Sequence, residues 1–132
     1  MKRAVIRAVI LLAHGSRDPE WSRPFERIAA QLSKKFLVRV AYLELMRPSL
    51  DEAVASLSAA GARSIRVVPL FLAQGRHVRQ DLPRLLAGAT AAHPTVKVIV
   101  EKPIGEDPAV IKAIAGAIAA GIPAARGSGS RS

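Results

Sequence analysis

The sequence predicts an α/β fold, a three-layer sandwich built around a four-stranded parallel sheet with flavodoxin-like topology. Four apolar runs of strand length alternate with four segments whose apolar residues recur at helical spacing. Half of the 132 residues are hydrophobic and only 4% are aromatic, a composition typical of parallel strands buried on both faces. Because such strand–helix units connect by right-handed crossovers, we expect the strand order 2-1-3-4.

The first strand–helix unit begins with Val5–Ala13, a nearly continuous apolar run that predicts a buried strand. The polar loop His14–Trp21 follows. A helix then begins near Ser22, with Pro24 in its first turn, where the missing N–H costs nothing. One apolar face of this helix is formed by Phe25, Ile28, Ala29 and Leu32.

The second unit begins with the predicted strand Val38–Leu45. Ser49 and Glu52 form an S-x-x-E capping box at the start of the next helix. Gly61 occupies the position where a left-handed C-terminal cap is expected. The apolar face between these signals consists of Leu50, Ala53, Val54 and Leu57.

The third unit begins with the predicted strand Ile65–Leu72, whose apolar character favours a central position in the sheet. Pro69 cannot donate to a strand ladder, so we expect a bulge or the end of the strand there. After a predicted loop over Ala73–Gln80, Asp81 is expected to cap a helix. The apolar positions of that helix are Leu82, Leu85, Leu86 and Ala89.

The fourth strand is predicted at Val96–Val100, and Asp107 followed by Pro108 starts the last helix. The apolar face of this helix comprises Ile111, Ile114, Ala115 and Ile118. We therefore predict a single domain over residues 1–122. Residues 123–132, which end in a Gly/Ser-rich stretch, are expected to be a disordered tail.

The composition excludes several classes of protein. The absence of cysteine rules out disulfides and thiolate metal sites, so any metal must bind histidine nitrogen or oxygen ligands. Arg7 interrupts the N-terminal apolar run, and no segment approaches the ~20 apolar residues of a membrane span. We therefore expect a cytoplasmic protein without a membrane partner.

The formal net charge of +10 has two interpretations, an ordinary basic surface or attraction to a polyanion. Nucleic acid is one candidate polyanion, and a small molecule with many carboxylates is another. The basic residues are scattered along the chain and aromatic stacking platforms are scarce, which disfavours nucleic acid.

Candidate functional residues follow the first three predicted strands. In open parallel sheets, ligands bind beyond the carboxyl ends of the strands, where the strand order reverses. His14 follows the first strand, Glu44 lies at the end of the second, and His77 follows the third, whereas His93 is expected at the opposite edge. Neighbouring strands lie about 4.8 Å apart, so two imidazoles on adjacent loops can reach one metal ion.

Four arginines lie around the same predicted cleft, and each can equally be an ordinary surface charge. Their concentration there suggests a site for carboxylates, to which the helix N-termini add positive potential. These residues are Arg17, Arg47, Arg76 and Arg79.

Four segments together resemble the small sirohydrochlorin cobaltochelatase family, the short ATP-independent class II chelatases. The similarity runs from about Val5 to Ile118, and the third segment is the most specific. The segments are LLAHGSR at 11–17, AYLELMRPSLDEA at 41–53, VVPLFLAQGRHVRQDLP at 67–83 and EKPIGEDP at 101–108.

The resemblance implies an enzyme, a metal-chelating lyase that inserts Co²⁺ into sirohydrochlorin in cobalamin (vitamin B12) biosynthesis, with no organic cofactor. It implies that His14 is metal ligand and proton acceptor, and that His77 is the second ligand. It also implies a homodimer. Substrate contacts map onto Arg47, Leu72, Ala73, Gln74, Gly75 and Arg76.

Ordinary acid–base chemistry then suggests a mechanism. Metal insertion releases two pyrrole protons, for which we expect His14 to act as base and Glu44 as relay. Histidines bind metal in their neutral form, so activity should decrease in acid.

Other functions remain open at this point. Histidine sites discriminate weakly among Fe²⁺, Co²⁺ and Ni²⁺, so a ferrochelatase or nickelochelatase is an alternative. A carrier of metal or tetrapyrrole, without catalysis, would have almost the same sequence. A hydrolase is disfavoured because no G-x-S-x-G follows a strand, and phosphoryl transfer is disfavoured because no Walker motif occurs and Ala13 precedes His14.

Overall fold

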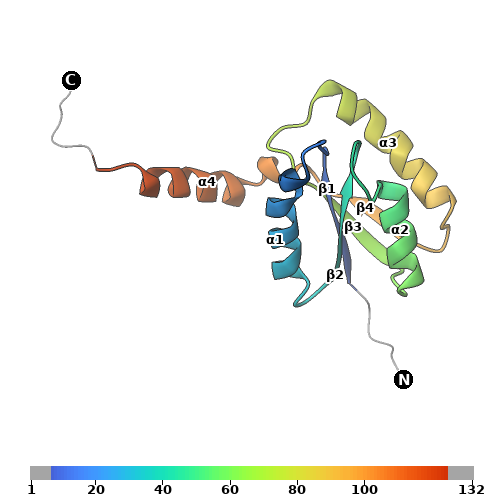
Figure 1. Ribbon diagram of the computed structural model, residues 1–132. Coiled ribbons are helices and arrows are strands. Elements are labelled where there is room, and N and C mark those ends of the chain that lie inside the picture. Colours follow the sequence, from blue (N-terminus) through green and yellow to red (C-terminus); the bar gives the residue numbers. More distant parts are fainter. Residues whose placement is uncertain (1–6, 125–132) are drawn as a thin grey trace.

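The structure is a computed structural model that describes residues 7–124 (Figure 1). It confirms the predicted α/β class and the parallel sheet in the order β2-β1-β3-β4. The beginning of the predicted first strand, Val5, lies outside the described residues, as do residues 125–132 of the predicted tail.

The elements alternate along the chain as expected, with two short 3-10 turns added before α1 and α4. The strands are β1 (Ala8–Ala13), β2 (Leu37–Tyr42), β3 (Ser64–Pro69) and β4 (Lys97–Val100). The helices are α1 (Arg23–Leu32), α2 (Leu50–Ala59), α3 (Arg76–Ala91) and α4 (Pro108–Gly121). The 3-10 turns are η1 (Pro19–Ser22) and η2 (Ile104–Glu106).

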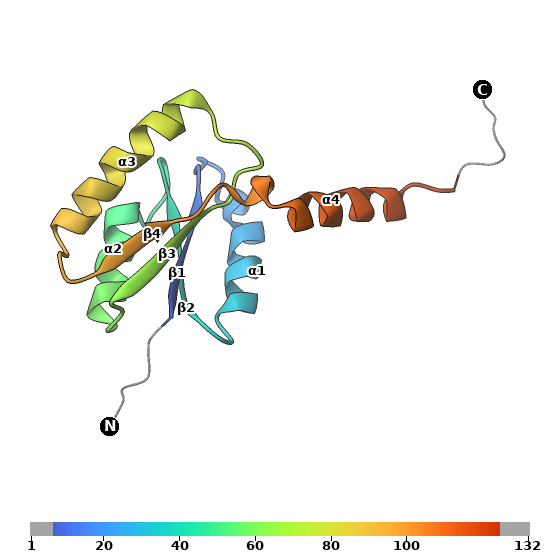
Figure 2. The same ribbon diagram turned by 180° about the vertical axis from the view of Figure 1, so that it is seen from behind.

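The sheet lies between two helical layers, with α2 and α3 on one face and α1 on the other (Figures 1 and 2). The main hydrophobic core lies under α2 and α3, where alternate residues of β1 and β3 are buried. Several of its side chains are fully inaccessible, and they are aliphatic, as the composition predicted: Ile10, Leu12, Val54, Leu57, Ile65 and Val67.

The local signals at the helix ends are confirmed. The Ser49 hydroxyl accepts from Glu52 N–H at 3.2 Å, and Ser49 N–H donates to the Glu52 carboxylate at 2.9 Å, so the capping box at α2 is complete. Gly61 follows α2 with a φ of 101°, and the Asp107 carboxylate accepts from Ala109 N–H at the start of α4. β3 ends at Pro69, which resolves the alternatives of bulge and strand end.

The expected start of α3 is wrong. Asp81 does not cap the helix, because α3 already begins at Arg76, with Gly75 as the N-cap and Arg79 N–H bonded to the Gly75 carbonyl at 3.0 Å. Pro83 therefore lies inside the helix, where it removes one backbone hydrogen bond. His77 consequently lies in the first turn of a helix rather than in a loop.

The last helix also differs from a simple sandwich, because α4 projects away from the sheet (Figures 1 and 2). No helix among residues 7–124 is long and apolar enough to span a membrane.

Candidate functional site

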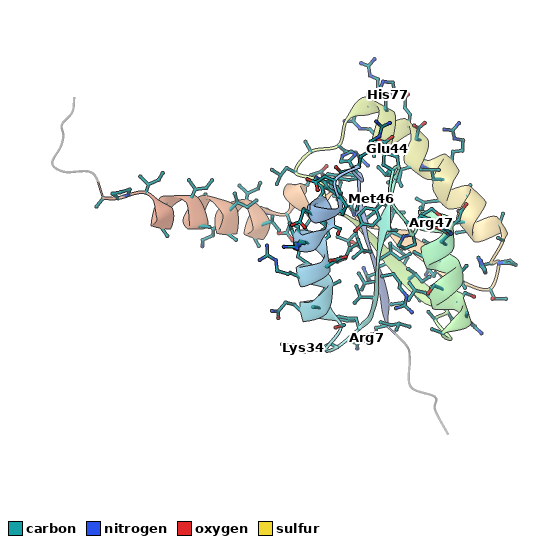
Figure 3. The ribbon with its side chains drawn as sticks, in the orientation of Figure 1. Arg7, Lys34, Glu44, Met46, Arg47 and His77 are labelled. Carbon is teal, nitrogen blue, oxygen red and sulfur yellow. The ribbon has the colours of Figure 1, made fainter. Side chains whose placement is uncertain are left out.

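His14, Glu44 and His77 line one pocket of about 270 Å³ at the carboxyl end of the sheet. Glu44 and His77 lie at the same end of the molecule in Figure 3. The remaining lining residues come from the chain after β2 and from α3, and they are Leu43, Val78, Asp81, Leu82 and Leu85. The pocket thus brings together three residues that are 30 or more positions apart along the chain.

The chain after β1 and the chain after β2 approach each other closely at Gly15. Glu44 N–H donates to the His14 carbonyl at 3.0 Å, and Leu43 N–H donates to the Ala13 carbonyl at 2.9 Å, so the strand pairing continues beyond β1 and β2. A Cβ atom at Gly15 would lie 1.8 Å from the Glu44 carbonyl oxygen, and Gly15 has a φ of 110°. Only glycine permits this approach without distortion, which places Glu44 beside His14.

A tight turn follows Glu44. Met46 N–H donates to the Glu44 carbonyl at 2.8 Å, which closes a three-residue turn around Leu45. Leu45 has a φ of 65°, an uncommon conformation for a residue with a side chain. Its side chain is 57% exposed, so the turn presents an apolar group to solvent next to the pocket.

Phe71 and Gly105, which the sequence analysis did not single out, support the loop that carries His14. The ring of Phe71 lies 4.3 Å from that of His14, centroid to centroid, and Phe71 is buried. Gly105 N–H donates to the Phe71 carbonyl at 2.9 Å, and a Cβ at Gly105 would lie 2.1 Å from the Leu72 carbonyl oxygen. The position of Phe71, two residues beyond the end of β3 and so beside the strand that precedes His14, was the available signal.

Asp81 is a further residue of the pocket that the sequence placed elsewhere. It follows His77 by four positions in α3, and such residues share one face of a helix. The Asp81 carboxylate accepts from Arg84 at 3.1 Å. Together with Glu44, it gives the pocket two carboxylates beside the two imidazoles.

Within residues 7–124, no three histidine, aspartate or glutamate side chains lie close enough together to hold one metal ion. In their present positions, at most two of these side chains could therefore hold one ion. The third histidine, His93, follows α3 and is not among the residues that line this pocket.

Arg47 lies apart from the pocket, beside α2 (Figure 3). Its guanidinium pairs with the Glu52 carboxylate through Nε, at 3.2 Å, and through Nη2. This hydrogen bond, together with that from the backbone N–H of Ser49, lowers the pKa of Glu52 to about 2. Glu52 therefore orients Arg47 while also completing the cap of α2.

The segment from Leu72 to Arg76 borders the pocket on the side of α3. Leu72 is 65% exposed, and Ala73, Gly75 and Arg76 are also exposed. Gln74 lines a neighbouring cavity of about 570 Å³, and its carbonyl accepts from Arg79 at 3.0 Å. Leu82 lines both cavities, so the two are adjacent.

Comparison with known proteins relates the whole arrangement to one family. The model of the CbiX family matches residues 8–120. The sirohydrochlorin cobaltochelatase of Saccharolobus solfataricus is 49% identical over 79 residues, which span 59% of this chain and 62% of that relative. That of Sulfolobus acidocaldarius is 35% identical over 104 residues, 78% of this chain and 82% of the relative.

Solved structures agree with this relationship. A CbiX protein from Marinobacter aquaeolei is 38% identical with a TM-score of 0.78, over 86% of this chain and 95% of that one. The sirohydrochlorin chelatase SirB from Bacillus subtilis, in complex with cobalt, is 26% identical with a TM-score of 0.75. The match covers 88% of this chain but only 51% of SirB.

Replacing Gly15 by Ala should destabilise the fold, because the new methyl group meets the Glu44 carbonyl and the backbone has a positive φ. We expect a loss of about 2 kcal/mol or more in the free energy of unfolding, measured by urea denaturation. The control is Gly75→Ala, where no atom lies within 4 Å of the added Cβ, and its change should stay within about 1 kcal/mol. Equal losses in both variants would contradict the proposed close approach.

Removing the guanidinium in Arg47→Met should raise the pKa of Glu52 from about 2 toward its ordinary value of 4.5. Because the folded pKa is below the unfolded one, the ionised carboxylate contributes stability above about pH 4.5, and this contribution is lost as pH falls through about 2. Carboxyl-carbon NMR titration measures the shift, with Arg84→Met as the control. A Glu52 pKa near 4.5 in the unmodified protein would refute the ion pair.

Proposed function

The chain belongs to the CbiX family, and from that premise we propose that it inserts Co²⁺ into sirohydrochlorin in cobalamin biosynthesis, as an ATP-independent chelatase. The observation that carries the proposal is the shared pocket of His14, Glu44 and His77 at the carboxyl end of a parallel sheet. The relatives named sirohydrochlorin cobaltochelatase match the chain over up to 82% of their length.

The metal ion is a substrate in this proposal, held by His14 and His77. Glu44 lines the same pocket and would be a third ligand, through its carboxylate oxygen, or a proton acceptor. Two or three protein ligands leave coordination positions free for the pyrrole nitrogens, which is necessary if the site is to transfer its metal ion to the macrocycle. The carboxylates of Glu44 and Asp81 add negative potential that attracts a divalent cation into the pocket.

The tetrapyrrole must lie across the mouth of the pocket. A volume of about 270 Å³ is below the ~300–1,000 Å³ of typical ligand pockets, so it can admit the metal but not enclose a macrocycle. The exposed side chains of Leu45 and Leu72 offer apolar contact to the flat ring. Arg47 and the backbone from Ala73 to Arg76 would bind the peripheral carboxylates, and the net charge of +10 would speed their arrival.

Proton removal is assigned to His14. Two N–H protons leave the macrocycle as the metal enters, and the imidazole of His14 accepts them in turn and passes them to Glu44 or to water. The buried ring of Phe71 holds the His14 imidazole in place during this transfer.

Beyond chelatase activity, the proposal also specifies the metal. SirB, which resembles this chain at 26% identity, has structures with cobalt and with Fe³⁺. Iron insertion is therefore the second candidate activity, since nitrogen and oxygen ligands bind both metals. Nickel insertion, and metal or tetrapyrrole carriage without catalysis, are the remaining alternatives that the experiment below distinguishes.

The proposal includes a homodimer that acts in the cytoplasm. A pocket too small to enclose its macrocycle supports a second protein surface over the substrate. A substrate that bears many carboxylates would not cross a bilayer unaided, so the enzyme must lie in the compartment where the substrate is made. This supports the cytoplasmic location in the proposal.

Purified protein mixed with sirohydrochlorin and Co²⁺ should catalyse many turnovers, at a rate above that of the uncatalysed reaction. The absorbance change of the macrocycle measures this rate. We expect His14→Ala and His77→Ala each to lower the rate by about 100-fold or more. His93→Ala is the control and should remain close to the unmodified protein. Fe²⁺ and Ni²⁺ in parallel reactions rank the metals.

Two results would overturn the assignment. Unchanged activity in either of the first two variants would remove the site. Binding of metal and tetrapyrrole at one equivalent without turnover would make the protein a carrier.

A further inference from the structure

The ion pair of Arg47 with Glu52 joins the loop after β2 to the first turn of α2. Tyr42 N–H donates to the Pro48 carbonyl at 2.9 Å, which closes this loop at its base. Arg47 lies just before that closure, and its guanidinium bonds the Glu52 carboxylate through Nε and Nη2. The same short loop therefore carries Glu44 of the pocket and an oriented cation (Figure 3).

A contribution to folding does not explain why this pair is present. The Arg47 side chain is 84% exposed and that of Glu52 is 37% exposed, and exposed ion pairs contribute little to stability. The cap of α2 needs only an oxygen that accepts from Ser49 N–H, which a glutamine would supply equally well. What the carboxylate adds to the cap is a two-point contact that fixes the plane of the Arg47 guanidinium.

This contact leaves one edge of the guanidinium free. An arginine side chain has five N–H donors, and Glu52 accepts from one on Nε and one on Nη2. Within residues 7–124, Nη1 of Arg47 donates to no protein group. The Nη1–Nη2 edge therefore keeps the remaining donors, in the planar arrangement that matches the two oxygens of a second carboxylate.

The charge on Glu52 does not prevent a second carboxylate from binding there. The Glu52 carboxylate already accepts from Arg47 and from Ser49 N–H, and it lies in the first turn of α2, where the helix dipole offsets a negative charge. The hydrogen bond to Glu52 also raises the pKa of Arg47, so the guanidinium stays charged.

The free edge lies within reach of a macrocycle placed over the pocket. Arg47 follows Glu44 by three residues, so their Cα atoms are at most about 11 Å apart. A tetrapyrrole that lies across the mouth of the pocket extends its carboxylate arms beyond the ring. Arg47 can therefore bind one arm while the pyrrole nitrogens face the metal ion.

We propose that Glu52 is a positioning residue for substrate binding, which presents the Nη1–Nη2 edge of Arg47 to a carboxylate of the tetrapyrrole. This inference rests on the proposed function, since it takes the macrocycle as the ligand. Long side chains lose rotamer freedom when they bind a ligand, which weakens binding. Because Glu52 orders Arg47 before the substrate arrives, the substrate binds without that loss.

Titration of sirohydrochlorin into the metal-free protein, followed by the fluorescence of the macrocycle, measures the effect without turnover. Glu52→Gln keeps an oxygen for the cap of α2 but loses the two-point contact, so it should raise the dissociation constant about 3- to 10-fold. Arg47→Met should raise it at least as much. The double variant should match Arg47→Met within about twofold, because Glu52 acts through Arg47.

Ser49→Ala is the matched control. It removes the hydroxyl that accepts from Glu52 N–H and leaves the Glu52 carboxylate bonded to Arg47. It should lower the free energy of unfolding, measured in urea, without changing the dissociation constant. Glu52→Gln should do the reverse, and in Co²⁺ insertion it should raise KM for the tetrapyrrole while kcat stays close to that of the unmodified protein.

Four results would overturn the role of Glu52. These are an unchanged dissociation constant in Glu52→Gln, an equal loss of affinity in Ser49→Ala, a further loss in the double variant, and no binding of sirohydrochlorin by the unmodified protein. Binding without metal insertion would refute the chelatase activity alone, because the dissociation constants still decide whether Glu52 acts through Arg47.

Discussion

The close approach of Gly15 to Glu44 is the constraint on which the candidate site depends. One backbone hydrogen bond, from Glu44 N–H to the His14 carbonyl, continues the pairing of β1 with β2 beyond their ends. That contact requires a residue without a side chain at position 15, since a Cβ would overlap the Glu44 carbonyl. The histidine after one strand and the carboxylate after its neighbour are therefore held together by main-chain geometry rather than by side-chain packing.

Contacts with neighbouring segments of the chain position the remaining residues of the site. Phe71 contacts the His14 ring and is itself bonded through its carbonyl to Gly105, in the turn that precedes α4. The early start of α3 brings His77 and Asp81 onto one face, over the same pocket. The sheet, the turn η2 and the first turn of α3 thus converge on a single region at the carboxyl ends of the strands.

Local signals predicted most of the fold, because they act within a few residues. The capping box at Ser49 and the Asp107–Pro108 helix start have short-range causes, and apolar periodicity located all four strands. The start of α3 was missed because Gly75 caps it without a side-chain bond, while Asp81 before Pro83 imitated a helix start. Val78, four residues before the buried Leu82, was the signal that the helix extends further back.

Long-range features were less accessible from the sequence. The strand order identified which loops meet, and so brought His14, Glu44 and His77 into consideration, but the contacts of Phe71 and Gly105 depend on how separate segments pack. The ion pair that draws Arg47 to Glu52 was likewise not evident, because Glu52 was already explained by its cap. The same limit applies to α4, whose apolar stripe predicted burial without indicating which surface provides it.

The most direct test of the central claim follows the histidine ring signals by NMR while Co²⁺ is added to the labelled protein without tetrapyrrole. Paramagnetic Co²⁺ shifts the resonances of groups close to it, so binding between the two imidazoles should shift His14 and His77 together at one equivalent and leave His93 in place. Shifts confined to one of the two, or equal shifts at His93, would show that the two histidines do not share one metal ion.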